Sequence, residues 1–520
     1  MRRRAVLLLT VMTATLVVVA SPAWATTFTV NSIQDTGDTT PDGTCDTCTL
    51  REAIQEANAN NNDPTVDVIN FDIPGVGLHT ITPGLLLPDI TERVTINGYS
   101  QPGATANTLK VGNDAALKIE LDGASIPAGG GPLDSGLKIK AANSTVKGLV
   151  ISNWENCVFL DTGTTGNQVI GNFIGTDVSG THPGNTGVTI QAGADDNIIG
   201  GTTAATRNII SGNNGHGVSI SGARNKVQGN YIGTSATGDT TLGNNNGVVI
   251  QGAANNIIGG TTAVARNVIS GNSTFGINIF DPGATGNKVQ GNYIGTSVAG
   301  DTRLANGNAG VRVSDASNNT IGGTTAGAGN IISGNGSDGV EILGSSSGTT
   351  GNRILSNSIY ENDALGIDLV HFNDFPGGVT CNDSGDGDVG PNNTQNFPVI
   401  NSAKLTTKRI GGHRRKVILI KGTLNSEADK TYNVQFFGSP EANPISAFPS
   451  VCETSGFGEG KRFLGQKSVT TNDSGNASFT FQSRKKVPNG QVVTATATNK
   501  STGDTSEFSK ACTVPGVPCP

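Results

Sequence analysis

Residues 208–234 read Asn-Ile-Ile-Ser-Gly-Asn-Asn-Gly-His-Gly-Val-Ser-Ile-Ser-Gly-Ala-Arg-Asn-Lys-Val-Gln-Gly-Asn-Tyr-Ile-Gly-Thr, and parts of this stretch return along the chain. The opening string, Asn-Ile-Ile-Ser-Gly-Asn, recurs from Asn267 with one substitution and from Asn330 unchanged, at spacings of 59 and 63 residues. The closing string, Asn-Tyr-Ile-Gly-Thr, recurs from Asn292. A long unit therefore repeats, and self-similarity at a fixed period is typical of solenoid architectures.

A shorter period lies inside that unit. Apolar-x-apolar triplets, most of them after a glycine, begin at intervals of 21 to 34 residues. Short β-branched runs alternate with Gly, Asn, Ser and Thr, which is the composition of strands and turns without intervening helices. Stacking each strand on its counterpart one coil later, about 4.8 Å away and parallel, would make the triplets an inward apolar ladder. The triplets begin at Leu137, Val158, Val188, Val218, Val248, Ile277, Val311, Val340 and Ile367.

The repeated asparagines are expected at the turns of this solenoid. Asn208, Asn267 and Asn330 hold the same place in the repeat. Asn tolerates the left-handed backbone conformation and hydrogen-bonds neighbouring backbone groups, so we expect both properties at these three positions.

Composition agrees with an all-β chain. Of 520 residues 73 are Gly, while aromatic residues make up 5% and charged residues 14%. A hydrophobic content of 35% with few charges argues against disorder. Gly at this frequency would destabilise helices by about 1 kcal/mol per interior copy, which argues against a helical bundle. Because the glycines do not occupy every third position, a collagen-like chain is excluded as well.

Residues 1–25 have the order of a secretory signal peptide. Arg2, Arg3 and Arg4 precede an apolar run, and Ala23-Trp24-Ala25 supplies the small residues of a cleavage site. We therefore expect a secreted protein, extracellular or attached to the cell surface. No later stretch approaches the length of about 18 apolar residues that a transmembrane helix needs.

Three further segments follow the signal. Residues 26–395 are predicted to form the parallel β-helix, beginning with a short capping helix after the capping-box pattern Thr49-Leu50-Arg51-Glu52. Residues 396–513 lose the repeat and alternate in the manner of an immunoglobulin-like or fibronectin-like β-sandwich, and residues 514–520 are expected to be a tail. Charge divides at the same boundary, with a net charge of −18 for residues 26–400 and +8 for residues 401–520.

Two features resemble one known family. The segment Cys45-Asp46-Thr47-Cys48-Thr49-Leu50-Arg51-Glu52-Ala53-Ile54 resembles the signature of the secreted bacterial CSLREA-type proteins, with Thr49 where the signature has Ser. The Gly-Asn-x-Ile-Gly-Thr and Ile-Ser-Gly-Asn repeats resemble those of the same proteins. This resemblance covers about residues 26–395 and implies export and the right-handed parallel β-helix of the pectin lyase-like superfamily. It implies no single reaction, because that superfamily includes lyases, hydrolases, epimerases and adhesins.

The candidate catalytic residues are Asp195, Asp196 and His216. They resemble the paired Asp and the Gly-His-Gly of polygalacturonases, and paired carboxylates are what glycosidic hydrolysis needs. Coil arithmetic opposes this interpretation, because a period of 30 residues places His216 over Thr186 and places the two carboxylates beneath residues 225 and 226. The alternative role for His216 is decoration of a turn.

A lyase would need an Arg or Lys base. Arg207 and Arg266 recur at one repeat position, but Gly329 replaces them in the third copy, so we expect these arginines to support turns.

Oxygen-rich residues gather between the two predicted domains. Asp383, Asp386 and Asp388 lie on one Gly-rich loop whose hard oxygen ligands suit calcium. Two interpretations stay open at this point, a calcium-rigidified hinge and a solvated acidic loop.

The cysteines suit an oxidising compartment. Cys45 and Cys48 are expected to form a local disulfide beside the capping helix. Cys452, Cys512 and Cys519 can supply one more bridge, with its connectivity open.

The basic sandwich suggests what the protein binds. Arg414-Arg415-Lys416 and Arg484-Lys485-Lys486 indicate either adhesion to an anionic polysaccharide or cell-envelope polymer, or an ordinary solvated surface. Few aromatic residues interleave with these cations, so nucleic acid is not the expected partner. We expect a non-catalytic, adhesin-like surface protein. The alternative is a carbohydrate-active enzyme, either a polysaccharide lyase or a polygalacturonase-like glycoside hydrolase.

Overall fold

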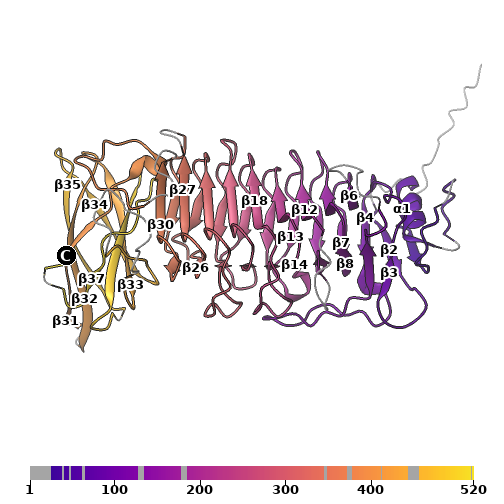
Figure 1. Cartoon of the computed structure of the whole chain (residues 1–520), viewed down its shortest axis with the longest axis horizontal. Coiled ribbons are helices and arrows are strands. Elements are labelled where there is room, and N and C mark those ends of the chain that lie inside the picture. Colours follow the sequence, from indigo (N-terminus) through magenta and orange to yellow (C-terminus); the bar gives the residue numbers. More distant parts are fainter. Residues whose placement is uncertain are drawn as a thin grey trace, which may run out of the picture.

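The computed structural model describes residues 25–37, 40–45, 48–60, 65–126, 134–176, 184–344, 348–371, 378–411, 413–442, 456–485, 487–516 and 518–519. Most of the predicted signal peptide, together with Cys452 and Lys486, lies outside these residues. An elongated parallel β-helix is followed by two antiparallel sheets at one end, which confirms the predicted fold class (Figure 1). No described helix is long and apolar enough to cross a membrane.

The β-helix consists of three parallel sheets with 11, 10 and 9 strands, and every coil after the first two contributes one strand to each sheet. The first sheet contains β1 (Thr27–Val30), β2 (Asp67–Phe71), β4 (Val94–Asn97), β7 (Thr145–Lys147), β10 (Gln168–Ile170), β13 (Ile198–Gly200), β16 (Lys226–Gln228), β19 (Ile257–Gly259), β22 (Lys288–Gln290), β25 (Thr320–Gly322) and β28 (Arg353–Leu355). The second contains β3 (His79–Ile81), β5 (Ile119–Asp122), β8 (Leu149–Ser152), β11 (Phe173–Ile174), β14 (Ile209–Ile210), β17 (Tyr231–Ile232), β20 (Val268–Ile269), β23 (Tyr293–Ile294), β26 (Ile331–Ser333) and β29 (Ser358–Tyr360).

The third sheet confirms the predicted apolar ladder. Its strands pair with Val188 on Val218, Val218 on Val248, and the series continues to Ile367. All of these ladder residues are buried, so one continuous core runs along the helix. The strands are β6 (Ser135–Ile139), β9 (Asn156–Leu160), β12 (Thr186–Ile190), β15 (His216–Ile220), β18 (Asn246–Gln251), β21 (Ile277–Phe280), β24 (Val311–Ser314), β27 (Val340–Gly344) and β30 (Ile367–His371).

A glycine precedes eight of the nine triplets, and the packing at the corner of the coil requires it. A Cβ atom on Gly247 would lie 2.6 Å from the Cγ2 methyl of Ile269 and 2.5 Å from the carbonyl oxygen of Gly276. Real carbon contacts are not that short, so a side chain here would push the third sheet away from the second. The pattern of glycine followed by apolar-x-apolar thus describes a turn in which the backbone itself lines the core.

Buried asparagines form three ladders inside the turns. The backbone N–H of Asn197 donates to Oδ1 of Asn225 at 2.8 Å, and the N–H of Asn225 donates in the same way to Asn256 at 2.8 Å. Each amide therefore satisfies a buried backbone group of the neighbouring coil. The first ladder is Asn167, Asn197, Asn225, Asn256, Asn287, Asn319 and Asn352. The second is Asn172, Asn208, Asn230, Asn267, Asn292, Asn330 and Asn357. The third is Asn213, Asn244, Asn272, Asn306, Asn335 and Asn362.

These ladders correct one expectation and confirm another. Asn208, Asn267 and Asn330 hydrogen-bond to backbone groups as predicted, but none of them has a positive φ. Their role is to fill the interior of a turn rather than to adopt a left-handed conformation. Other asparagines, such as Asn143 (φ 57°) and Asn255 (φ 62°), take the left-handed positions.

The N-terminal helix closes the first coil as predicted. Helix α1 (Leu50–Ala59) begins after Thr49, whose hydroxyl accepts the N–H of Glu52 at 3.1 Å. Its apolar face joins the core of the β-helix, and it lies at the indigo end of Figure 1. Arg51 binds Asp35 through two nitrogens at 2.8 and 3.0 Å and also donates to two backbone carbonyls. The Leu-Arg-Glu-Ala string is thus the lid of the solenoid and its anchor. Short 3₁₀ turns occur at η1 (Gly98–Ser100), η2 (Ala204–Thr206) and η4 (Pro391–Thr394).

The C-terminal sandwich has two antiparallel sheets around its own apolar core. The segment predicted as a tail packs against it, because Cys519 is disulfide-bonded to Cys512 and its N–H donates to the carbonyl of Asn401. One sheet contains β31 (Val399–Ile410), β32 (His413–Asn425) and β35 (Asn476–Ser483). The other contains β34 (Arg462–Thr470), β33 (Thr431–Ser439), β36 (Val492–Asn499) and β37 (Cys512–Thr513).

Candidate functional site

The structure does not bring the candidate catalytic residues together. Asp195 and Asp196 lie after β12, where Arg224 of the next coil approaches them at 3.1 and 2.8 Å. The two carboxylates bind this arginine, which raises its pKa through the hydrogen bond and charge of Asp196 first. Asp195 and Asp196 are therefore ion-paired with the turn of the next coil.

The predicted register at this turn was wrong by two residues. Asp195 accepts the N–H of Ala223, so the coil here is 28 residues long rather than 30. The difference arises in the turn between β15 and β16, residues 221–225, which is two residues shorter than the turn between β12 and β13, residues 191–197.

His216 lies at the opposite end of its strand from that ion pair. It opens β15, is half-buried, and its Nδ1 is 3.2 Å from the side-chain nitrogen of Asn246. Burial lowers the pKa of His216. Seven residues separate its level from that of Ala223, up to about 23 Å of extended chain. The histidine and the carboxylates therefore share no site.

Arg207 and Arg266 support the turns, as the sequence predicts. The guanidinium of Arg207 lies over the ring of Tyr231 at 4.5 Å, and that of Arg266 lies over Tyr293 at 4.0 Å. Arg207 also donates to the carbonyls of the 109–112 segment, so its charge is used inside the structure.

One group of ionisable side chains does gather on the outer face of the third sheet. Arg312, Glu341 and Asp368 occupy successive rungs in register, and Nε of Arg312 lies 3.4 Å from Glu341. Asp338 is close by, and the three carboxyls are only 6%, 8% and 3% exposed for Asp338, Glu341 and Asp368. Burial raises the pKa of Asp338 to about 6, and burial with the charge of Asp338 raises that of Asp368. These carboxyls are buried although they lie on the outer face of the sheet, and the charge of Glu507 of the sandwich also raises the pKa of Asp368.

The sandwich closes the open end of the β-helix. The unpaired N–H groups of the last coil donate to side chains of the sandwich rather than to water. Backbone pairing adds one antiparallel bridge, between Ile359 and Gly460. The donor and acceptor pairs are Gly351 with Asp504, Ile354 with Thr505, Ser356 with Gln435, and Leu369 with Glu507.

Two of the asparagine ladders end in the same region. Glu459 continues the third ladder, because its Oε1 accepts the N–H and the amide of Asn362 at 3.2 and 3.0 Å. Its Oε2 accepts the N–H of Glu361 at 2.6 Å. Asn392 continues the first ladder by accepting the N–H of Asn352 at 3.0 Å. Burial raises the pKa of Glu459 to about 7 and that of Glu507 to about 8.

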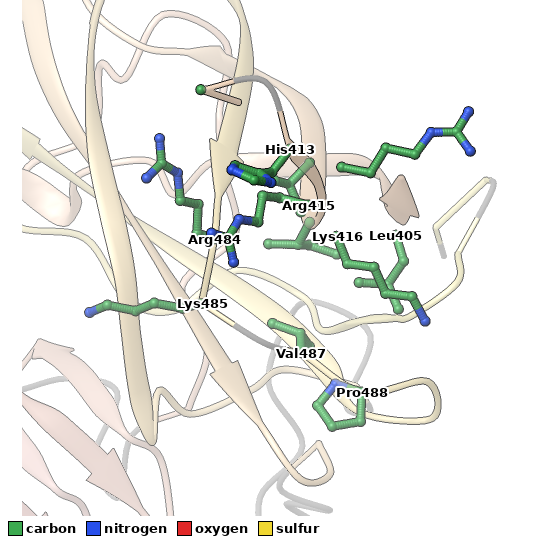
Figure 2. Close-up of a pocket in the computed structure, with 12 residues that line it drawn as sticks. Leu405, His413, Arg415, Lys416, Arg484, Lys485, Val487 and Pro488 are labelled. Carbon is green, nitrogen blue, oxygen red and sulfur yellow. The ribbon is translucent and has the colours of Figure 1, made fainter. Parts of the chain in front are cut away.

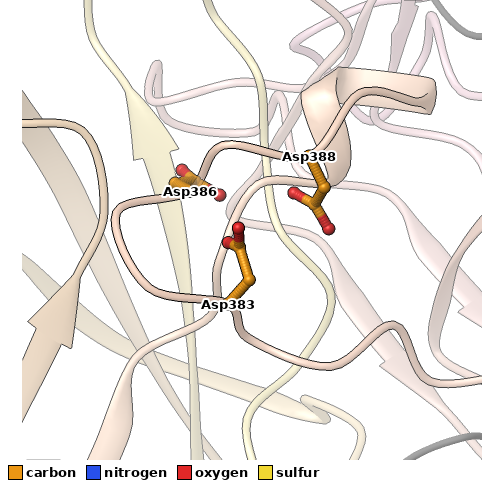
Figure 3. Close-up of side chains that lie close together, drawn as sticks. All are labelled: Asp383, Asp386 and Asp388. Carbon is orange, nitrogen blue, oxygen red and sulfur yellow. The ribbon is translucent and has the colours of Figure 1, made fainter.

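The three aspartates predicted to bind calcium do lie together (Figure 3). One oxygen of each of Asp383, Asp386 and Asp388 lies within 4.8 Å of the others. Asp386 already accepts hydrogen bonds within the protein, from the N–H of Asn396 at 2.8 Å and from the side-chain amide of Gln395 at 2.7 Å. Burial raises the pKa of Asp386 to about 7. Within the described residues, Oδ1 of Asp388 is buried without a hydrogen-bond partner.

The disulfides follow the prediction where it was specific. Cys45 and Cys48 are bonded beside α1. The open question of the C-terminal bridge is answered by Cys512 and Cys519. Cys157 is a free, buried thiol, and burial raises its pKa to about 12.

A hollow of about 1170 Å³ lies on the sandwich. It is formed by the β31–β32 hairpin and the segment after β35. Its lining combines basic and apolar side chains, and in Figure 2 Arg484 and Lys485 lie on one side and Lys416 on the other. Val417, Ile418 and Val487 are buried beneath the exposed cations.

The hairpin that borders this hollow places positive charges of one strand opposite positive charges of the other. Lys408 pairs with Arg415 across the hairpin, and Arg409 pairs with Arg414. Like charges directly opposite each other destabilise a strand pair. No acidic residue lies within 399–425, and none of the hairpin cations forms an ion pair among the residues that the structure describes.

The sequence predicts only part of this basic surface. Arg414-Arg415-Lys416 and Arg484-Lys485-Lys486 stand out as basic runs, but neither run by itself points to the other or to Lys408 and Arg409. A signal was present, since Gly411-Gly412 between two strand-like runs is typical of a two-residue hairpin loop, which places those cations opposite each other.

Compared with known proteins, the chain matches no family model and no curated protein. Its function must therefore be inferred from the fold and from the chemistry of these sites.

Proposed function

We propose that the chain is a secreted, non-catalytic binding protein that attaches to an anionic polysaccharide or another anionic polymer of the cell envelope. The observation that carries this proposal is the basic hairpin, where Lys408 faces Arg415 and Arg409 faces Arg414 without any acidic neighbour. A surface that destabilises its own strand pair gains by binding an anionic partner, because the partner's charges relieve the repulsion.

The separation of the candidate catalytic residues supports the non-catalytic part of the proposal. Asp195 and Asp196 are bound to Arg224, and His216 lies at the other end of its strand. A general acid or base must lie within hydrogen-bond reach of the atom that it serves, so these groups cannot act on one bond.

We also propose membership of the CSLREA-type secreted β-helix proteins of the pectin lyase-like superfamily. Support comes from Cys45-Asp46-Thr47-Cys48-Thr49-Leu50-Arg51-Glu52-Ala53-Ile54, whose Arg51 and Thr49 have structural roles at the N-terminal lid. Export rests on the signal-like residues 1–25.

The test is a binding measurement with a soluble anionic polysaccharide at low and high salt. We expect binding that weakens with salt and that falls in the double variant Arg414→Gln/Arg415→Gln. Lys421→Gln is the matched control, because Lys421 is an exposed cation of β32 outside the patch. Equal binding by the double variant and the control contradicts the proposal. Degradation of a polyuronate or glycan that is abolished by His216→Ala or Asp196→Ala would establish the enzyme alternative.

We propose calcium as the ligand of the loop that holds Asp383, Asp386 and Asp388. The support is the spacing of the carboxylates within 4.8 Å and the buried, unpartnered Oδ1 of Asp388. Carboxylate oxygens are the ligands that calcium prefers, and a cation would relieve the repulsion between them. The melting temperature should fall on chelation in the native chain and stay constant in Asp383→Asn; an unchanged melt in the native chain contradicts calcium binding.

A further inference from the structure

The residue that follows the predicted signal peptide is held firmly in the first coil of the β-helix. Cleavage after Ala25 would make Thr26 the first residue of the exported chain. The N–H of Thr26 donates to Oδ1 of Asp67 at 2.7 Å. Its carbonyl accepts the N–H of Val68 at 2.9 Å, and its hydroxyl accepts the side-chain amide of Asn60 at 3.1 Å. These contacts fix the position of the nitrogen atom that cleavage would free.

Asp67 is a fully buried carboxylate at the point where it receives that nitrogen. It begins β2, is 0% exposed, and its Oδ2 accepts the side-chain amide of Asn60 at 2.9 Å. In the part of the chain that the structure describes, no ion pair joins Asp67 to a lysine or arginine. Burying a carboxylate is costly unless its charge is compensated. The surroundings of Asp67 therefore suit a cation, and the atom bound to its Oδ1 is the Thr26 nitrogen.

We propose that removal of the signal peptide turns the Thr26 nitrogen into an ammonium group that forms an ion pair with Asp67 and fastens the first coil. Hydrolysis of the Ala25–Thr26 peptide bond leaves a carboxylate on Ala25 and a protonated amine on Thr26, so the donor at Asp67 gains a full positive charge. Hydrogen bonds between charged groups are stronger than those of a neutral amide. This inference rests on the export part of the proposed function, because signal peptidase acts only on exported chains.

The ion pair would join three segments of the N-terminal end. Thr26 directly precedes β1, Asn60 ends α1, and Asp67 opens β2. Strand β1 is the edge of the first sheet and pairs only with β2, so it is the strand of that sheet that opens most easily at this end. Before cleavage the same nitrogen is a neutral amide. We therefore expect β1 to open more often in the precursor than in the mature chain.

Hydrogen exchange of the full mature chain, followed by mass spectrometry, tests the ion pair. Selective acetylation of the Thr26 amine keeps an N–H for Asp67 but removes the positive charge, as in the precursor. Exchange in β1 and β2 should become about tenfold faster, which is the ratio expected between a charged and a neutral donor. Exchange in the distant strand β18 should not change. A chain that begins at Ala25 moves the ammonium group by about 3.8 Å along the backbone and should behave like the acetylated chain.

Two variants show whether the effect depends on Asp67. In Asp67→Asn the carboxylate is gone, so acetylation should change the exchange of β1 by less than about twofold. Asp72→Asn is the matched control, because Asp72 is an exposed carboxylate directly after β2 whose N–H donates to Val30 of β1. In this control the tenfold effect of acetylation should persist.

Equal exchange in the free and acetylated chains overturns the ion pair, and so does an acetylation effect that persists in Asp67→Asn. The mass of the exported chain gives an independent check. A first residue other than Thr26 overturns the inference and leaves export standing, whereas a chain that keeps residues 1–25 overturns both. Loss of polysaccharide binding with an intact acetylation effect contradicts the proposed binding function and leaves the ion pair standing.

Discussion

The sharpest prediction concerns Glu459, which joins the sandwich to the end of the β-helix. Glu459 is 4% exposed, and its carboxylate accepts the N–H of Glu361, the N–H of Asn362 and the side-chain amide of Asn362. Glu459→Ala removes all of these acceptors at once. Each buried donor left without a partner costs roughly 1–3 kcal/mol. A space of about 70 Å³ beside Glu459 lets water accept hydrogen bonds from some of these donors. We therefore expect the free energy of unfolding to fall by about 3 kcal/mol.

The loss should appear as undocking rather than as global unfolding. The β-helix core includes only Phe437 and Phe508 from the sandwich, which has a further core of its own, so the sandwich should separate first. Calorimetry should then show an early transition that the native chain lacks. Limited proteolysis should cut between the two domains at a lower temperature. Glu441→Ala is the matched control, because Glu441 is an exposed glutamate beside the same space. If Glu459→Ala unfolds within about 0.5 kcal/mol of that control, the sandwich does not act as the end cap.

The other predictions concern the ladders, the corner glycines and pH. Asn256→Ala removes the acceptor of a buried N–H one coil earlier and should destabilise the chain by about 2–4 kcal/mol in urea denaturation, whereas the exposed Asn214→Ala should change it by less than about 0.5 kcal/mol. Gly247→Ala should lower stability by about 1–3 kcal/mol, and an unfolding midpoint equal to that of the native chain would refute the close packing at this corner. Asp338 and Glu507 have raised pKa values of about 6 and about 8, so the folded chain holds protons that the unfolded chain has released. The contribution of these two groups to stability should therefore be greatest below about pH 4 and be lost as the pH rises toward 8, which a melting series across that range will check.

Much of the fold could be predicted because a solenoid makes local pattern and tertiary position equivalent. The interval between Val188 and Val218 is one coil, so reading it from the chain places the two side chains on top of each other. Where a turn changes length, that equivalence breaks. The step from Asp195 to Ala223 is 28 residues, because the turn between β15 and β16 is two residues shorter than the turn one coil earlier.

The candidate sites were harder to predict for the same physical reason. Basic runs at Arg414 and Arg484 are 70 residues apart, and only the pairing of β32 with β35 brings their segments to one hollow. Glu459 looks like any other glutamate in the sequence, since nothing near it marks the end of a ladder that begins at Asn213.

The sequence by itself determined the parallel β-helix, its capping helix and the separate sandwich, because each depends on a periodicity, a capping pattern or an alternation that neighbouring residues carry. The tertiary structure alone decided which charges meet. It bound Asp195 and Asp196 to Arg224, buried Asp368 on the outer face of the β-helix and placed the cations of one hairpin strand opposite those of the other. Contacts of that kind join residues whose spacing along the chain follows no period, so only the folded chain can define them.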